Sequence, residues 1–158
     1  MRYVFKNCTL LDGTKDMKPQ PNTDVAVENG KITEIGEIAT GSNDEVVNLN
    51  GKYLMPGLIN LHVHLPAGGK PQNKPMNTTK LTKFALSSSV SKALVLKMCH
   101  AYAMQGLMSG VTTVRVVGGL DDLDTKLRDK INAGKLDGPR MFVSNYAIGV
   151  PHGHMVGS

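Results

Sequence analysis

The sequence predicts an α/β protein in which a β-rich part, residues 1–55, precedes a part, residues 56–158, that alternates strands with helices. Three observations predict this class. The first part carries a hairpin signature, the second carries apolar runs that suit buried strands, and helical patterns lie between those runs. Strands that alternate with helices in this way form a parallel sheet with right-handed crossovers.

The hairpin signature of the first part lies within residues 25–35. Asn29-Gly30 suits the two positive φ angles of a type I′ turn, and apolar residues alternate on both sides of it. This register places Glu28 opposite Lys31, which is a favourable cross-strand pair. We expect further strands at residues 2–7, 46–47 and 53–54.

The second part is predicted to follow the order β-α-β-α-β. The expected strands are residues 58–65, 111–117 and 140–146, and the expected helices are residues 89–109 and 121–133, with a short helical piece near 81–86. Ser88 or Ser89 can cap the longer helix, on which we expect Leu94 and Met98 to face a core. The loop at residues 66–79 exceeds the usual length after such a strand, which marks it as a candidate functional loop.

Charge is distributed unevenly along the chain. Residues 1–55 carry a balance of −2 and residues 56–158 a balance of +7, within a formal total of +5. A basic half can bind polyanions, but its lysines are scattered and aromatic residues make up only 4% of the chain, too few for base-stacking platforms. We therefore expect no nucleic-acid partner. A polyanion-binding module is a weaker interpretation than the two that are set out below.

The chain contains no apolar stretch of the roughly 18 residues that a membrane span needs. Its N-terminus also lacks the apolar region of a secretion signal. We expect no membrane partner and a cytoplasmic location. Cys8 and Cys99 are expected to be small core residues, because two cysteines make no disulfide framework.

His62 and His64 are the strongest candidates for chemistry. They lie two residues apart near the end of an apolar strand, so both imidazoles point to the same face. The carboxyl ends of parallel strands are where α/β folds place their active sites, and neutral imidazole binds Zn²⁺ and similar ions well. The alternative is two core histidines satisfied by hydrogen bonds, but this pattern favours metal binding.

Four motifs resemble the amidohydrolase superfamily, in the family's order. They are residues 51–64, similar to the first barrel strand (Pro-Gly-Leu-Ile-Asp-x-His-x-His), residues 110–115, similar to the second (Gly-Val-Thr-Thr-x-Arg-Asp), residues 138–140, similar to the entry to the third, and residues 150–154, similar to a Thr-Gly-Gly-His turn of the imidazolonepropionase and prolidase-like branch. The resemblance covers almost the whole chain.

The resemblance implies a metal-dependent (β/α)8 TIM barrel, of which this chain holds the first three βα units, preceded by a small β-sandwich formed by residues 1–55. His62 and His64 match two ligands of a site for one or two divalent ions, with Zn²⁺ expected. The implied reaction is hydrolysis of a C–N bond in an amide, cyclic amide or dipeptide-like small molecule by a metal-activated hydroxide. The remaining ligands come from later strands in the family, so we expect this chain to be a truncated, inactive portion.

The chain departs from the family pattern at three positions. Asn60 replaces the aspartate before the histidines, Val116 replaces the acid that follows Arg115, and His152 replaces a glycine. Asn60 keeps its hydrogen-bonding ability but loses a charge near the metal. We therefore expect a weaker negative field at this site than the family pattern supplies.

Two further residues are candidates for contacts with substrate. Arg115, at the end of a strand, can bind a substrate carboxylate or pair with a buried acid for structure. His154 matches the histidine of the family turn, where it lies on the substrate side or behind the metal ligands, although a simple loop histidine is equally consistent.

A different class of function stays open. Three barrel strands leave unpaired parallel edges and an exposed apolar face, which invite pairing with another chain. The alternative to an enzyme is thus a non-catalytic protein derived from an amidohydrolase half. In either case we expect a homo-oligomer formed through the exposed barrel edges.

Overall fold

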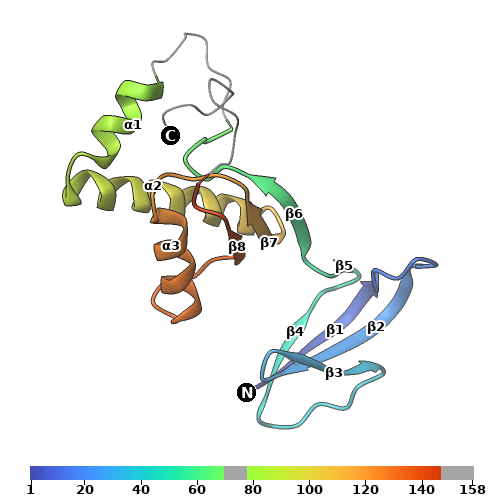
Figure 1. The fold of residues 1–158 in the computed structure, drawn as a ribbon. Helices are drawn as coiled ribbons and strands as arrows, with labels where there is room; N and C mark the ends of the chain where they lie inside the picture. The colour runs from blue at the N-terminus through green and yellow to red at the C-terminus, as the bar shows by residue number, and fades with distance from the viewer. Residues whose placement is uncertain (70–77, 147–158) are drawn as a thin grey trace. The chain divides into compact units, whose positions relative to one another are not determined.

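The computed structural model describes residues 1–69 and 78–146. The chain separates into two compact units, Met1–Pro56 and Gly57–Ser158, which are described one at a time (Figure 1). The first unit is made of strands, and the second combines strands with helices. The predicted mixed α/β class is therefore confirmed.

The first unit is one sheet built around its first strand. Its strands are β1 (Arg2–Leu10), β2 (Gln20–Glu28), β3 (Lys31–Gly36), β4 (Asp44–Asn48) and β5 (Tyr53–Leu54). On one side β1 pairs antiparallel with β2, which pairs with β3. On the other side β1 pairs parallel with β4 and then with β5.

The hairpin between β2 and β3 forms as the sequence predicts. Glu28 pairs with Lys31, and Asn29 and Gly30 have φ angles of 51° and 73°. The predicted β-sandwich, in contrast, is not formed by residues 1–56. The strands that would begin a second layer, β4 and β5, pair with β1 and extend the same sheet.

Asp24 is a buried charge on β2 that connects β1 with the segment after β3. Its carboxylate accepts hydrogen bonds from Nζ of Lys6 and from the main-chain N–H groups of Asn7 and Ile38. Burial alone would raise the pKa of Asp24, but these hydrogen bonds and the charge of Lys6 outweigh it and lower the pKa. Asp24 therefore stabilises the fold in its ionised form.

The second unit is a three-stranded parallel sheet covered by helices. Its elements are β6 (Leu58–Val63), α1 (Thr78–Leu86), α2 (Ser89–Met108), β7 (Val111–Val116), α3 (Leu123–Asn132) and β8 (Arg140–Val143). The strands pair in the order β6-β7-β8, which confirms the predicted parallel sheet. No helix among the described residues has the length and apolar character to cross a membrane.

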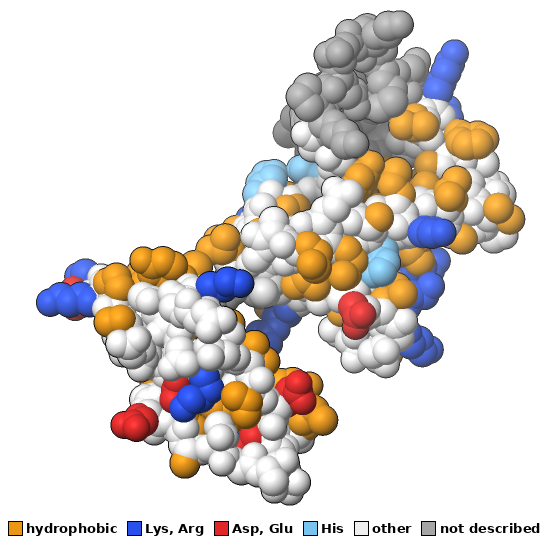
Figure 2. Space-filling model, turned by 180° about the vertical axis from the view of Figure 1, so that it is seen from behind, with side chains coloured by type: hydrophobic (Ala, Val, Ile, Leu, Met, Phe, Trp, Pro, Cys, Tyr) orange, Lys and Arg blue, Asp and Glu red, His pale blue; other side chains and the backbone are white. Residues whose placement is uncertain are grey.

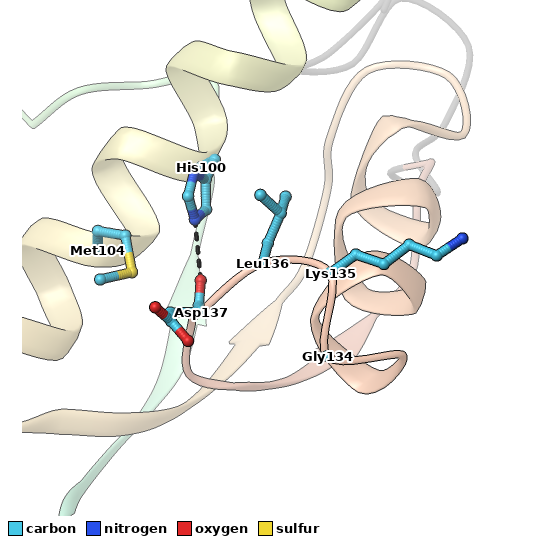
Figure 3. A pocket seen from close by; sticks show the side chains of 6 residues that line it. All are labelled: His100, Met104, Gly134, Lys135, Leu136 and Asp137. Atoms are coloured by element: carbon cyan, nitrogen blue, oxygen red, sulfur yellow. Dashed lines mark hydrogen bonds between the residues drawn. The ribbon is translucent and has the colours of Figure 1, made fainter.

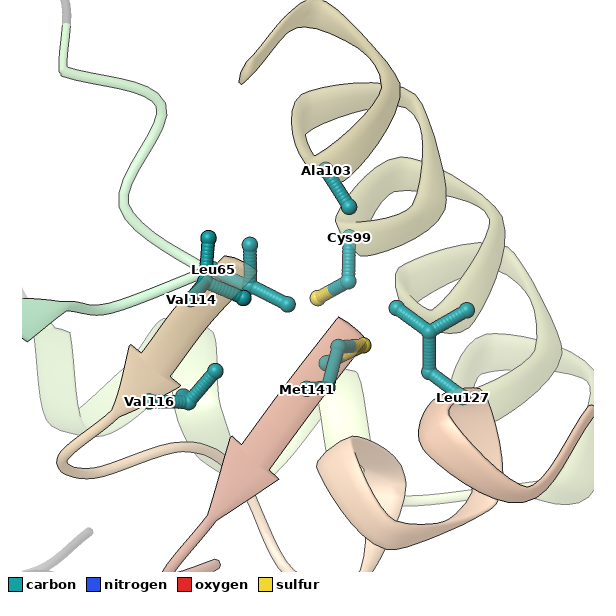
Figure 4. Close-up of a cluster of buried hydrophobic side chains, with 7 residues drawn as sticks. All are labelled: Leu65, Cys99, Ala103, Val114, Val116, Leu127 and Met141. Atoms are coloured by element: carbon teal, nitrogen blue, oxygen red, sulfur yellow. The ribbon is translucent and has the colours of Figure 1, made fainter. Parts of the chain in front are cut away.

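The core of the second unit lies between the sheet and the helices α2 and α3. It consists of seven buried side chains (Figure 4): Leu65, Cys99, Ala103, Val114, Val116, Leu127 and Met141. The small residues Cys99 and Ala103 let α2 lie close to the strands. Ser88 caps α2 through reciprocal hydrogen bonds with Ser91, as the sequence predicts, and Gly110 follows the helix with a φ of 96°.

The prediction that Leu94 and Met98 face a core is wrong. Leu94 is 67% exposed and Met98 is 36% exposed, because α2 turns the opposite side, with Cys99 and Ala103, toward the sheet. The helix carries apolar residues around most of its circumference, so periodicity alone does not identify the buried face. Figure 2 shows hydrophobic side chains on the surface of the molecule.

We expect Asp24→Asn to lower the free energy of unfolding at pH 7 by about 2 kcal/mol, because it removes the ion pair with Lys6 and leaves buried donors poorly satisfied. Urea unfolding followed by circular dichroism measures this loss. A lowered pKa contributes stability above the ordinary range of the carboxyl and loses it in acid, so the difference should shrink below about pH 4.

Asp16→Asn is the matched control, because Asp16 is exposed in the loop that precedes β2. It should change stability by less than about 0.5 kcal/mol. Equal effects of the two substitutions would show that Asp24 has no special structural role.

Candidate metal centre

His62 and His64 meet at the carboxyl end of β6. Their Nε2 atoms lie 3.3 Å apart, and the two rings stand edge to face with centroids 5.1 Å apart. His62 is exposed and His64 is half-buried. The convergence that the i, i+2 spacing predicts is therefore present.

The hydrogen bond of His64 determines which of its nitrogens carries the proton. Its Nδ1 lies 2.9 Å from the carbonyl oxygen of Gly118, just beyond the end of β7. A carbonyl oxygen only accepts, so Nδ1 donates and the neutral ring keeps a lone pair on Nε2. The contact between the two histidines is then a hydrogen bond from Nε2 of His62, and a bound cation would take the place of that proton.

Asn60 acts on the main chain of the site. Its Oδ1 accepts a hydrogen bond of 3.1 Å from the main-chain N–H of His62. In this stretch three steps along β6, from Asn60 to Val63, match two steps along β7, from Val114 to Val116, so β6 contains a bulge. Asn60 therefore supports the irregular backbone that presents His62, a role that the sequence did not reveal.

The distance between the two histidine nitrogens suits a zinc ion. Two nitrogens 3.3 Å apart, each at the usual Zn–N distance of about 2.0–2.1 Å, subtend an angle of about 107° at the ion, near the tetrahedral value. Among the described residues no third His, Cys, Asp or Glu side chain joins them. The pair is thus compatible with part of a metal site.

Asp124 is a buried carboxylate near this pair that the sequence analysis missed. It lies in the first turn of α3, is 1% exposed, and neither of its oxygens has a hydrogen-bond partner within the part of the chain that the structure describes. Burial raises its pKa to about 6, and the charge of His64 acts in the opposite direction. An acid in the first turn of a helix is usually a solvated charge, so only the preceding pair Gly118-Gly119 hinted at a close contact.

Arg115 lies on β7 next to the histidine strand. Its Nε donates a hydrogen bond of 2.8 Å to the carbonyl oxygen of Leu61, and the side chain is exposed. Within the described part of the chain it makes no ion pair with an acid, which argues against the structural pairing considered from the sequence. Arg115 also lines an open hollow of about 420 Å³ with Phe142, Ser144 and Tyr146.

An ion pair and its neighbouring hydrogen bonds lie at the carboxyl ends of β7 and β8. Asp121, in the loop between β7 and α3, accepts hydrogen bonds from Nζ of Lys92 at 2.6 Å and from the hydroxyl of Tyr146 at 2.8 Å. Asn145 accepts two further hydrogen bonds: its side-chain Oδ1 accepts from the hydroxyl of Thr125, and its main-chain carbonyl oxygen accepts from the N–H of Gly119. These bonds hold the loops after β7 and β8 in place around the candidate site.

The remaining histidines contribute nothing to this site within the described residues. His152 and His154 lie outside the residues that the structure describes, so the prediction for His154 stays a prediction. His100 points from α2 toward the carbonyl oxygen of Asp137, 2.8 Å away (Figure 3). It lines a separate hollow of about 320 Å³ with Met104 and Lys135.

No family model matches the chain. A dihydroorotase of Bacillus thuringiensis (strain Al Hakam) is 36% identical over 81 residues, which are 51% of this chain and 18% of that protein. The chain therefore spans less than a fifth of the length of the curated relatives it matches.

Solved structures match almost the entire chain. A candidate prolidase from Bifidobacterium longum has a TM-score of 0.74 and 26% identity over 98% of this chain and 32% of its own. Molinate hydrolase has a TM-score of 0.73 and 29% identity over 94% of this chain and 30% of its own. The resemblance to the amidohydrolase superfamily, and to its prolidase-like members, is confirmed. These relatives are hydrolases by name, and each is about three times as long as the part that matches.

We expect Gly119→Ala to destabilise the second unit, because the added methyl group would overlap Oδ2 of Asp124. The loss should be about 1–3 kcal/mol in urea unfolding. Adding Asp124→Ala should recover part of it, since the two changes share one contact and are not additive.

Gly106→Ala is the matched control. A methyl group at Gly106 meets no atom within 4 Å, and a helix interior favours alanine over glycine by about 0.5–1 kcal/mol. This substitution should stabilise the chain. Equal effects at the two glycines would contradict the close packing of Asp124 on Gly119.

Proposed function

We propose that this chain is part of a metal-dependent hydrolase that cleaves C–N bonds in an amide, cyclic amide or dipeptide-like small molecule. The observation that carries the proposal is the pair of Nε2 atoms, 3.3 Å apart, at the carboxyl end of β6. The relatives support it, because a dihydroorotase is similar to half of this chain in sequence and a prolidase-like protein is similar to almost all of it in structure. Completion of a (β/α)8 barrel, and of the ligand set, would require residues beyond these 158.

His62 and His64 would hold the ion, and zinc is the ion that their chemistry fits best. A bound divalent ion supplies a hydroxide nucleophile at neutral pH and polarises the scissile carbonyl. The carbonyl oxygen of Gly118 accepts the hydrogen bond from Nδ1 of His64, which would leave the Nε2 lone pair available to the ion. Asn60 orders the backbone that carries His62.

Arg115 would hold an anionic group of the substrate. Its Nε is bound to the main chain of β6, which fixes the side chain and leaves the outer face of the guanidinium for a ligand. The adjoining hollow, with Phe142 and Tyr146, offers apolar surface beside a positive charge. A small molecule with a carboxylate next to an apolar group suits this arrangement. His154 would add a contact on the substrate side.

The test of this proposal is zinc binding. We expect the chain to bind about one Zn²⁺ per molecule in competition with a chromogenic chelator at pH 7, and His62→Ala and His64→Ala each to weaken binding by about tenfold or more, because each removes one of two ligands. Catalytic activity is expected to be low or absent in these 158 residues, since two ligands fall short of a catalytic site.

His100→Ala is the control for nonspecific binding. His100 lies on α2 and bonds to the main chain of Asp137, away from the pair. Its removal should leave zinc affinity unchanged. Zinc binding that is insensitive to all three substitutions would overturn the proposal.

Self-association is a second property that one observation favours. β6 and β8 are the edge strands of the sheet among the described residues, and Ile59 and Leu61 on β6 are each 63% exposed. Exposed apolar side chains on an unpaired edge favour contact with another chain. We propose that copies of this chain associate through these barrel edges, as expected for a non-catalytic alternative and equally for an incomplete enzyme.

We expect Ile59→Lys combined with Leu61→Lys to shift the chain toward monomer in light scattering at high concentration, because a buried edge contact would not accept two charges. Ile32→Lys is the control, since Ile32 is similarly exposed (64%) but lies on β3 in the first unit. A wild-type chain that is monomeric at high concentration would contradict the proposal.

A further inference from the structure

Asp124 is a buried acid, without an ion-pair partner among the described residues, that has no role in the proposed function as stated so far. A carboxylate shielded from water is costly unless a cation or hydrogen-bond donors compensate it. Asp124 is 1% exposed, and both of its oxygens lack a hydrogen-bond partner among the described residues. No Lys or Arg of the described residues forms an ion pair with it, unlike Asp24 in the first unit.

Asp124 is connected to the histidine pair through the neighbouring glycines Gly118 and Gly119. Its carboxylate lies against the Cα of Gly119, so closely that a methyl group there would overlap Oδ2. The neighbouring residue, Gly118, accepts the hydrogen bond from Nδ1 of His64. The ionisable groups that act on or respond to Asp124 are His64 and the buried thiol of Cys99, whose pKa is raised to about 12 mainly by burial. The thiol is neutral, so among the described residues the positive charge that could compensate Asp124 would arise on the side of His64.

We propose that Asp124 is the anionic partner of a cation held by His62 and His64, a positioning residue that strengthens cation binding across the Gly118-Gly119 turn without contacting the ion. The inference rests on the proposed metal-dependent function. It also explains why the site retains a negative charge although Asn60 and Val116 occupy the two positions where the family pattern carries acids.

A purely structural role for Asp124 predicts something different. An acid in the first turn of a helix stabilises that helix when it bonds to the free main-chain N–H groups or interacts with the helix dipole in water. Asp124 makes no such bond and is buried. Without a cation it therefore destabilises the fold, whereas a structural acid would stabilise it. The two roles are distinguished by the sign of the stability change.

The experiment compares Asp124→Asn with Asp129→Asn, which removes the same charge from an exposed position of the same helix. Zinc affinity is measured by competition with a chromogenic chelator at pH 7, and thermal unfolding is followed without metal. We expect Asp124→Asn to weaken zinc binding by about tenfold or more and to raise the metal-free Tm by about 3 °C or more. Asp129→Asn should leave zinc affinity within about twofold of the wild type.

Two outcomes would overturn the inference alone: unchanged zinc affinity in Asp124→Asn while His62→Ala and His64→Ala weaken it, or a lower metal-free Tm in Asp124→Asn. Zinc binding by the wild type that ignores both histidines would overturn the proposed function and the inference with it. The histidine variants thus separate the failure of one from the failure of the other.

Discussion

The hydrogen bond from Nδ1 of His64 to the carbonyl oxygen of Gly118 is the interaction on which the candidate site depends. It joins the residue just after β6 to the second residue after β7, where the carboxyl ends of two parallel strands meet. It also leaves the Nε2 lone pair of His64 facing His62. The bond can form only because β6 and β7 are adjacent and parallel, with Val63 opposite Val116.

The core behind the sheet holds the strands in that arrangement. Cys99 and Ala103 of α2 are small enough to let the helix lie against Val114 and Val116, whose neighbour Arg115 then projects on the opposite face. Because side chains alternate along β7, Val114 and Val116 pack under the helices, whereas Arg115 remains exposed at the surface. Packing and chemistry therefore use different faces of one strand.

The two buried aspartates illustrate opposite uses of a charge. Asp24 is surrounded by donors, and its pKa is lowered, so it stabilises the first unit as an anion. Asp124 has no donor, and burial raises its pKa to about 6, so its ionised form is a cost to the second unit. Local instability of this kind is common where a protein holds groups ready for a ligand. The unpaired charge thus lies in the unit that carries the two candidate metal ligands.

Much of the local structure could be predicted because it depends on neighbours in the chain. The hairpin at Asn29-Gly30, the cap at Ser88 and the helix end at Gly110 follow from turn and capping chemistry, which acts over a few residues. The orientation of α2 could not be predicted, because apolar residues lie on both of its sides and Leu94 was assigned to the wrong face. The single sheet of the first unit also differs from the expected sandwich, since pairing of β4 with β1 is a long-range choice.

The sequence by itself determined that His62 and His64 share one face at the end of a buried strand, because alternation along a strand is a local property. Only the tertiary structure decided what surrounds them. Gly118 and Asp124 are more than fifty residues away in the chain, and they reach His64 because β7 pairs with β6 and α3 begins beside that edge. The spacing of residues along the chain identifies candidate ligands that lie on one strand. The residues that orient these ligands, or add a charge beside them, lie on other elements and are brought close by tertiary contacts.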